Sequence, residues 1–246
     1  MSPVMTSATV GRAPTGTNGT IEQRFAPMSA GRRPRSPNIL YVDSALTTDE
    51  IGAYAGIDGT PDIDRFARSG VRLASVEPGP GAHGARIPEV LLDCGYDCGV
   101  FGLMPEADTE ADVDAAARFI AARRPGPWAA YVHIATSAPE RVDRAVGRLV
   151  HALRRAGHYR RTAMLLVGAA CAREQFVPTM LSWPGQIPSR QRHDEPVHLA
   201  DWVPTLLETA QPGLTQTLDL GGVDLSSHLF VGGPVPERSA ALTRAA

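Results

Sequence analysis

Short apolar runs that alternate with helical patterns place the strongest constraint on the fold of this 246-residue chain. The runs are continuously apolar, which is typical of strands buried on both faces of a sheet. They cover residues 38–42 (NILYV), 71–76 (VRLASV), 98–103 (CGVFGL), 128–135 (WAAYVHIA), 163–169 (AMLLVGA) and 177–183 (VPTMLSW). Alternation of this kind predicts an α/β fold, with a mostly parallel sheet sandwiched by helices.

The clearest predicted helix runs from Glu140 to Ala156. Its apolar residues fall on one stripe of the helical surface, and its arginines lie mostly away from that stripe. The stripe consists of Val142, Val146, Leu149, Val150 and Leu153. Ligands of parallel sheets covered by helices bind beyond the carboxyl ends of the strands, so we expect functional residues there.

The composition divides the chain into three parts. Residues 1–36 are rich in Gly, Pro, Ser and Thr and lack hydrophobic periodicity, so they predict a disordered N-terminal tail. Residues 37–230 are predicted to form one α/β domain, and residues 231–246 a C-terminal tail. All 24 basic residues are arginines, which excludes a lysine nucleophile, a Schiff base or a phosphate-loop lysine.

Charge and cysteine usage restrict the possible partners and the compartment. A net charge of −2 gives no long-range attraction for nucleic acid or for an anionic membrane. No stretch approaches the roughly 20 apolar residues that a membrane helix needs. The three cysteines (Cys94, Cys98 and Cys171) form no metal-binding pattern, and no secretory signal is evident. We therefore expect a cytoplasmic protein with reduced structural thiols.

TPDIDRFARSGVRL (60–73) is similar to a known family segment, TPNIDRLAxEGVRF, and IPEVLLDCGYDCGVFG (87–102) is similar to another, LPEVLKEAGYxTALFG. In this order, the segments resemble the sulfatases of the alkaline-phosphatase superfamily. Residues 141–167, 177–188, 198–208 and 221–229 resemble later segments of the same domain. The resemblance covers most of the chain from Pro37 to Leu229 and implies a truncated sulfatase-like α/β domain.

The resemblance also implies a particular chemistry. The family holds a divalent cation, usually calcium, with carboxylates and a side-chain amide or imidazole, and this cation neutralises the sulfate oxygens. A formylglycine made from Cys or Ser in a C/S-x-P-x-R motif attacks the sulfur. Arg, Lys and His side chains stabilise charge and move protons.

The first metal ligands of the family are two consecutive aspartates after the first strand. Asp43 matches one of them, and Ser44 stands at the other. If the register is set from Gly52 instead, the two positions are Ser44 and Ala45, and both ligands are lost. Asp43 is therefore the one metal ligand that the resemblance retains. A structural role for Asp43, capping the turn that follows, is equally compatible with the sequence.

The other catalytic positions carry no chemistry. The second metal pair falls on Ala169 and Ala170, the family lysine on Leu103, and the family histidine on Glu140. His83, Gly84 and Arg86 resemble the stretch downstream of the nucleophile, so the nucleophile segment is predicted to be deleted. One carboxylate cannot supply the 6–8 oxygens that calcium takes, so we expect no bound cofactor.

One segment, SAPER (137–141), matches the serine form of the nucleophile motif but lies two strands too late. A structural role accounts for it: Ser137 is the predicted N-cap of the following helix, with Glu140 as its capping-box partner.

The histidines offer a second possible site. His193 and His198, with Asp194 and Glu195, form the densest cluster of potential ligands for zinc. The same stretch resembles the family's approach to a helix that an aspartate such as Asp201 caps or packs against. His133 is expected to be a hydrogen-bonded core residue.

These features favour a degenerate, catalytically inactive sulfatase-like protein, a pseudoenzyme retained for binding or protein interaction. The expected partner is a protein, or an anionic small molecule bound by arginines such as Arg86, and neither nucleic acid nor a membrane. Two alternatives stay open: a sulfuric-ester or phosphate-ester hydrolase with a rebuilt active site that uses Asp43, and a shortened gene product without activity.

Overall fold

A seven-stranded sheet forms the centre of the molecule in a computed structural model, which describes residues 36–78, 86–103, 108–123, 126–170, 176–217 and 220–237. The strands lie in the order β4-β5-β1-β6-β7-β2-β8. Their bounds are β1 Asn38–Ser44, β2 Val71–Leu73, β4 Asp97–Phe101, β5 Trp128–Ile134, β6 Thr162–Val167, β7 Thr179–Ser182 and β8 Gln191–His193. Only β7 runs antiparallel to its two neighbours, so the mostly parallel sheet is confirmed.

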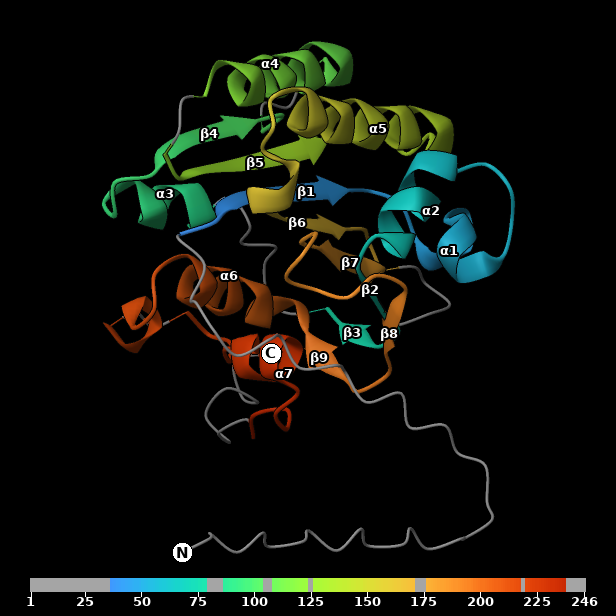
Figure 1. Cartoon of the computed structure of the whole chain (residues 1–246). Coiled ribbons are helices and arrows are strands. Elements are labelled where there is room, and N and C mark those ends of the chain that lie inside the picture. The colour runs from blue at the N-terminus through green and yellow to red at the C-terminus, as the bar shows by residue number, and fades with distance from the viewer. Residues whose placement is uncertain are drawn as a thin grey trace, which may run out of the picture.

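Helices cover both faces of this sheet (Figure 1). One face carries α2 (Pro61–Arg68), α4 (Thr109–Ala122) and α5 (Pro139–Arg155), and its core includes Leu40, Val42 and Ile120. The other face carries α3 (Arg86–Leu92), α6 (Trp202–Ala210) and α7 (Ser226–Val231), around Tyr41 and Trp202. The predicted sandwich is thus confirmed.

Short elements complete the chain. A two-stranded sheet pairs β3 (Val76–Glu77) with β9 (Val197–His198), and α1 spans Gly52–Ala55. The 3-10 turns are η1 (Thr48–Glu50), η2 (Tyr159–Arg161), η3 (Leu199–Asp201) and η4 (Leu214–Thr217).

The predicted elements agree closely with the observed ones. The helix predicted from Glu140 is α5, and its apolar stripe is buried except for the partly exposed Val150. The apolar run 71–76 forms two strands, β2 and β3, because the chain leaves the main sheet at Ala74 and pairs with β9. Strand β8 has the polar sequence QRH and no apolar run, so the sequence did not predict it.

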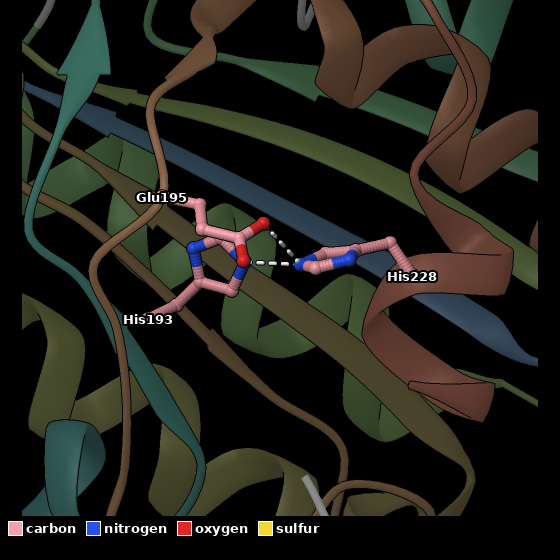
Figure 2. A group of neighbouring side chains, drawn as sticks. All are labelled: His193, Glu195 and His228. Atoms are coloured by element: carbon pink, nitrogen blue, oxygen red, sulfur yellow. Dashed lines mark hydrogen bonds and ion pairs between the residues drawn. The ribbon is translucent and has the colours of Figure 1, made fainter. Parts of the chain in front are cut away.

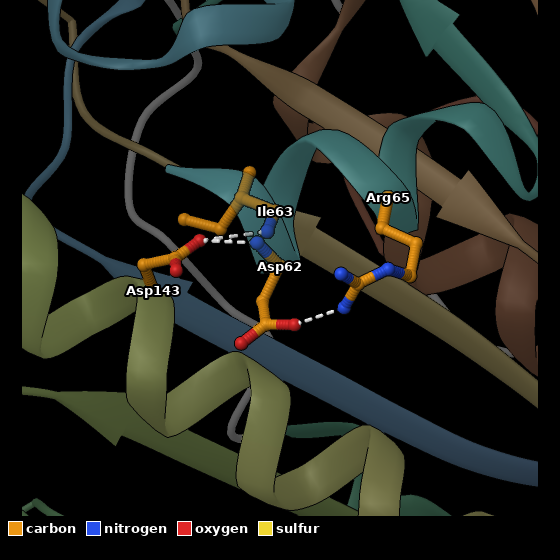
Figure 3. A network of polar contacts seen from close by, with 4 residues as sticks. All are labelled: Asp62, Ile63, Arg65 and Asp143. Atoms are coloured by element: carbon orange, nitrogen blue, oxygen red, sulfur yellow. Dashed lines mark hydrogen bonds and ion pairs between the residues drawn. The ribbon is translucent and has the colours of Figure 1, made fainter. Parts of the chain in front are cut away.

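A buried carboxylate joins α2 to α5 (Figure 3). Helix α2 begins after Thr60, whose side chain makes no capping bond. Instead, Asp143 of α5 accepts hydrogen bonds at Oδ1 from the backbone N–H groups of Asp62 (2.9 Å) and Ile63 (2.8 Å). These are the donors that an N-cap side chain normally satisfies. Asp143 therefore caps a helix other than its own.

Two findings concern membrane-spanning helices and the cysteines. Among the helices of the described ranges, none is long and apolar enough to cross a membrane. Cys94 and Cys98 are free thiols, and burial raises the pKa of Cys98 to about 11, which makes it a poor nucleophile. Cys171 lies outside the described residues, as do residues 1–35 and 238–246 of the two predicted tails.

Candidate functional site at the carboxyl edge of the sheet

Asp43 lies near the carboxyl end of β1, and its carboxylate is held by two side chains of β5. Its Oδ2 accepts a hydrogen bond from the Tyr131 hydroxyl at 2.9 Å and lies 3.0 Å from His133 Nδ1. The pairing of Asp43 with His133 across the β1–β5 ladder directs both side chains to one face of the sheet. The hydrogen bond predicted for His133 is confirmed, although its side chain is 35% exposed rather than buried in the core.

Tyr131 acts as a permanent donor to this carboxylate. Burial raises the pKa of its hydroxyl far above the ordinary value, and the charge and hydrogen bond of Asp43 raise it further. The hydroxyl therefore stays protonated well above the pH at which an ordinary tyrosine ionises. Oδ2 of Asp43 is therefore engaged from within the protein, and the prediction that Asp43 is a remnant metal ligand stays a prediction.

The neighbour of Asp43 has a structural role. Ser44, which stands at the second aspartate position of the resemblance, is 5% exposed, and its hydroxyl donates to the Val167 carbonyl oxygen at 3.2 Å. Because Val167 ends β6, this bond ties the carboxyl ends of two adjacent strands together.

The loop after β6 lies directly against the loop after β1. Ala169 N–H donates to the Leu46 carbonyl oxygen at 2.7 Å. A Cβ added at Gly168 would stand 2.2 Å from the same oxygen, so only glycine fits there. Ala169 and Ala170, the positions of the second metal pair, follow at once and carry no polar side-chain atom.

This donor set does not fit calcium. Calcium takes 6–8 oxygens, several from charged ligands, in a flexible shell. The resemblance places the family's ligand positions at Asp43, Ser44, Ala169 and Ala170. These four residues offer one carboxylate, that of Asp43, which already contacts Tyr131 and His133.

Two other positions implied by the resemblance, Leu103 and Glu140, also lie at this edge. Leu103 follows β4 and is 54% exposed, and Glu140 is exposed in the first turn of α5. His83 and Gly84 lie outside the described residues, and Arg86 is exposed at the start of α3. Parallel strands thus gather the expected positions at one edge, although their side chains form no catalytic constellation among the described residues.

The predicted N-cap at Ser137 is wrong. Helix α5 begins at Pro139 with Ala138 as its N-cap, and no side chain caps it. The hydroxyl of Thr136 instead accepts a hydrogen bond from Ala138 N–H at 3.3 Å. Proline fixes the backbone for the first turn and removes one unsatisfied donor, so the helix begins without a side-chain cap. Ser137 is exposed in the loop after β5.

The histidine cluster is arranged differently from the sequence pattern. His193 contacts His228 of α7, with Glu195 beside them (Figure 2). His198 lies apart, with its Nε2 2.9 Å from Glu77 Oε2. Asp201 is fully buried and accepts hydrogen bonds from the backbone N–H groups of His198 and Val223. This agrees with the capping or packing role that the sequence predicted for it. His228 was missed because 35 residues separate it from His193.

Solved structures with the same architecture are sulfatases and other proteins of the alkaline-phosphatase superfamily. The PsFucS1 sulfatase from Pseudoalteromonas sp. matches 81% of this chain and 73% of its own, with 15% identity and a TM-score of 0.65. The fold is sulfatase-like. An alkaline phosphatase superfamily protein from Vibrio parahaemolyticus matches 83% of this chain and 72% of its own, with 12% identity and a TM-score of 0.59.

A third structure was solved in complex with its substrate, D-glucosamine-2-N,6-O-disulfate. It matches 82% of this chain and 82% of its own, with 14% identity and a TM-score of 0.66. No family model and no curated protein sequence matches this chain. At these identities the similarity establishes the fold and leaves the activity to the residues.

Proposed function

We propose that this chain is a sulfatase-like scaffold that binds a partner without hydrolysing sulfate or phosphate esters. The state of Asp43 is the observation that carries the proposal. Its carboxylate is bonded to Tyr131 and His133, while Ala169 and Ala170 stand where further ligands are expected. Without a cation, Asp43, Ser44, Ala169 and Ala170 offer no positive charge to balance the charge that develops on a departing ester group.

An arginine-lined groove offers a place for an anionic partner. It measures about 530 Å³ and lies between α4 and α5. Arg144, Arg148 and Arg155 line it together with His151, small apolar residues and Asp62, whose carboxylate is paired with Arg65. Arg148 is engaged by Glu110 and Asp114 of α4, whereas Arg144 and Arg155 extend the positive surface along α5. Guanidinium groups bind sulfate and phosphate oxygens with paired hydrogen bonds.

A turnover assay tests the absence of catalysis. The full chain is incubated with an aryl sulfate and an aryl phosphate in the presence of calcium, magnesium or zinc. We expect no product beyond that formed with heat-unfolded protein. Turnover that is lost in Asp43→Ala or Ser137→Ala, but kept in the exposed control Ser189→Ala, would instead establish the alternative, a hydrolase with a rebuilt site.

A binding measurement tests the groove. The probe is D-glucosamine-2-N,6-O-disulfate, the substrate present in one of the similar structures. We expect its affinity, measured by calorimetry, to fall when Arg144 and Arg155 are both replaced by serine, and to fall with added salt. Replacing Arg118, exposed on α4 and outside the groove lining, is the matched control. Equal loss in both variants would contradict a specific groove.

A further inference from the structure

Two buried imidazoles and one exposed carboxylate converge between β8 and α7 (Figure 2). His193 ends β8, Glu195 follows it in the next turn, and His228 projects from α7. One ligand atom from each residue lies within 4.8 Å of the other two. His193 and His228 are 2% and 5% exposed, whereas Glu195 opens to solvent. The cluster thus has a closed side and an accessible side.

The backbone fixes the orientation of His228. Its Nδ1 lies 2.6 Å from the Gly233 carbonyl oxygen, which can only accept, so Nδ1 carries the proton. A neutral imidazole then has a lone pair on Nε2, and this atom faces Nε2 of His193. Glu195 Oε2 lies 3.8 Å from the same nitrogen. Histidines that bind metals are commonly held in this way, with the second ring nitrogen donating to a carbonyl.

We propose that His193, His228 and Glu195 form a binding site for a divalent transition-metal ion, with zinc as the best match. Two imidazoles and one carboxylate are a set that zinc takes, with water as the fourth ligand. Calcium and magnesium prefer all-oxygen sites, so they are poor competitors here. Ligand atoms around tetrahedral zinc stand about 3.3 Å apart, and atoms already within 4.8 Å of one another reach that spacing by small side-chain rotations.

This site is separate from the edge at Asp43. His193 and Asp43 lie in the same row of paired residues across the sheet. The residues between them in this row are Val167, Thr179 and Leu73. Four strand spacings lie between them, which is about 19 Å. A response to metal at either place can therefore be assigned by substitution, because residues this far apart act independently.

Metal titration of the full chain tests the proposal. Protein freed of metal with a chelator is titrated with Co²⁺, whose visible absorption reports tetrahedral coordination, and then with Zn²⁺. We expect one ion per chain, displacement of cobalt by zinc, and a melting temperature roughly 5–11 °C higher when zinc exceeds its Kd a hundredfold.

Variants then assign the ion to these residues. His228→Ala removes a ligand, but His228 is buried, so this variant can also destabilise the fold. Glu195 is exposed, so Glu195→Gln is expected to fold normally and provides the cleaner test. We expect Glu195→Gln to weaken zinc binding at least about tenfold. The matched control is His198→Gln, which breaks the histidine–glutamate pair between β9 and β3 and is expected to leave zinc affinity unchanged.

Two results would overturn the proposal. One is wild-type protein that unfolds cooperatively yet binds neither Co²⁺ nor Zn²⁺ at one ion per chain, which would make the two histidines a hydrogen-bonded structural pair. The other is a finding that Glu195→Gln and His198→Gln change the zinc affinity by the same amount.

Discussion

At the residue scale, the contacts of the Asp43 carboxylate are the main reason to expect no calcium at the carboxyl edge of the sheet. In a metal site its oxygens would face an ion, whereas here one of them is shared by Tyr131 and His133. Burial and the nearby negative charge raise the pKa of the Tyr131 hydroxyl, so it remains a donor well above the pH at which an ordinary tyrosine ionises.

A double-mutant cycle measures this interaction. Removing a hydrogen bond to a charged group costs about 1–3 kcal/mol, so we expect Tyr131→Phe to lower the melting temperature by roughly 2–12 °C. In an Asp43→Ala background the same substitution is expected to cost much less, with a coupling energy of about 1 kcal/mol or more. Additive effects in thermal melts would show that the two side chains do not interact.

Alkaline pH gives a second prediction at this scale. Burial raises the pKa values of Tyr41, Tyr54 and Tyr131 well above the ordinary value of about 10. The folded chain then keeps protons that the unfolded chain releases, so stability falls as pH rises past 10. In an absorbance titration, these tyrosines are expected to ionise together with the loss of structure. Their gradual ionisation in the folded protein would contradict this account.

At the scale of elements, Asp143 shows how a contact distant in sequence completes a local structure. Helix α2 lacks a side-chain cap of its own, and α5 supplies one from 80 residues away. Burial raises the pKa of Asp143, with Asp62 and Asp64 adding to the effect against its backbone hydrogen bonds. The capping oxygen matters more to the fold than the charge.

Two substitutions separate the oxygen from the charge. Asp143→Ala leaves two backbone N–H groups without their acceptor, so we expect a loss of about 3 kcal/mol, or roughly 6–12 °C in melting temperature. Asp143→Asn keeps an acceptor and is expected to change stability by less than about 1 kcal/mol at neutral pH. Equal losses in both variants would show that the charge is essential.

The difference in stability between wild type and Asp143→Asn is also predicted to depend on pH. An aspartate with a raised pKa holds its proton more tightly in the folded chain, so its contribution to stability falls as pH rises through the window above the ordinary aspartate pKa. The Asp143→Asn variant has no carboxyl group at this position and therefore lacks this pH-dependent contribution to stability. The melting temperature of wild type relative to Asp143→Asn should therefore decrease from acidic to neutral pH, and an increase would contradict the assignment.

At the scale of the whole molecule, periodicity predicted the sheet and α5 correctly because buried strands and amphipathic helices leave a continuous pattern. Strand β8 was missed because its residues are polar, and the cap of α5 was misplaced because Pro139 begins that helix without one. The partners of Asp43 were not predicted, because strand register decides which side chains meet. His228 reaches His193 only through the packing of α7, which no local pattern encodes.

We propose that the carboxyl edge of this sulfatase-like sheet does not bind calcium. Thermal unfolding of the full chain, first in EDTA and then with millimolar calcium, tests it most directly. The account predicts one sharp transition that calcium does not move. A calcium site with a Kd a hundredfold below the added ion would stabilise the fold by about 2.7 kcal/mol. That corresponds to a rise of roughly 5–11 °C, and such a rise, abolished by Asp43→Ala, would contradict the claim.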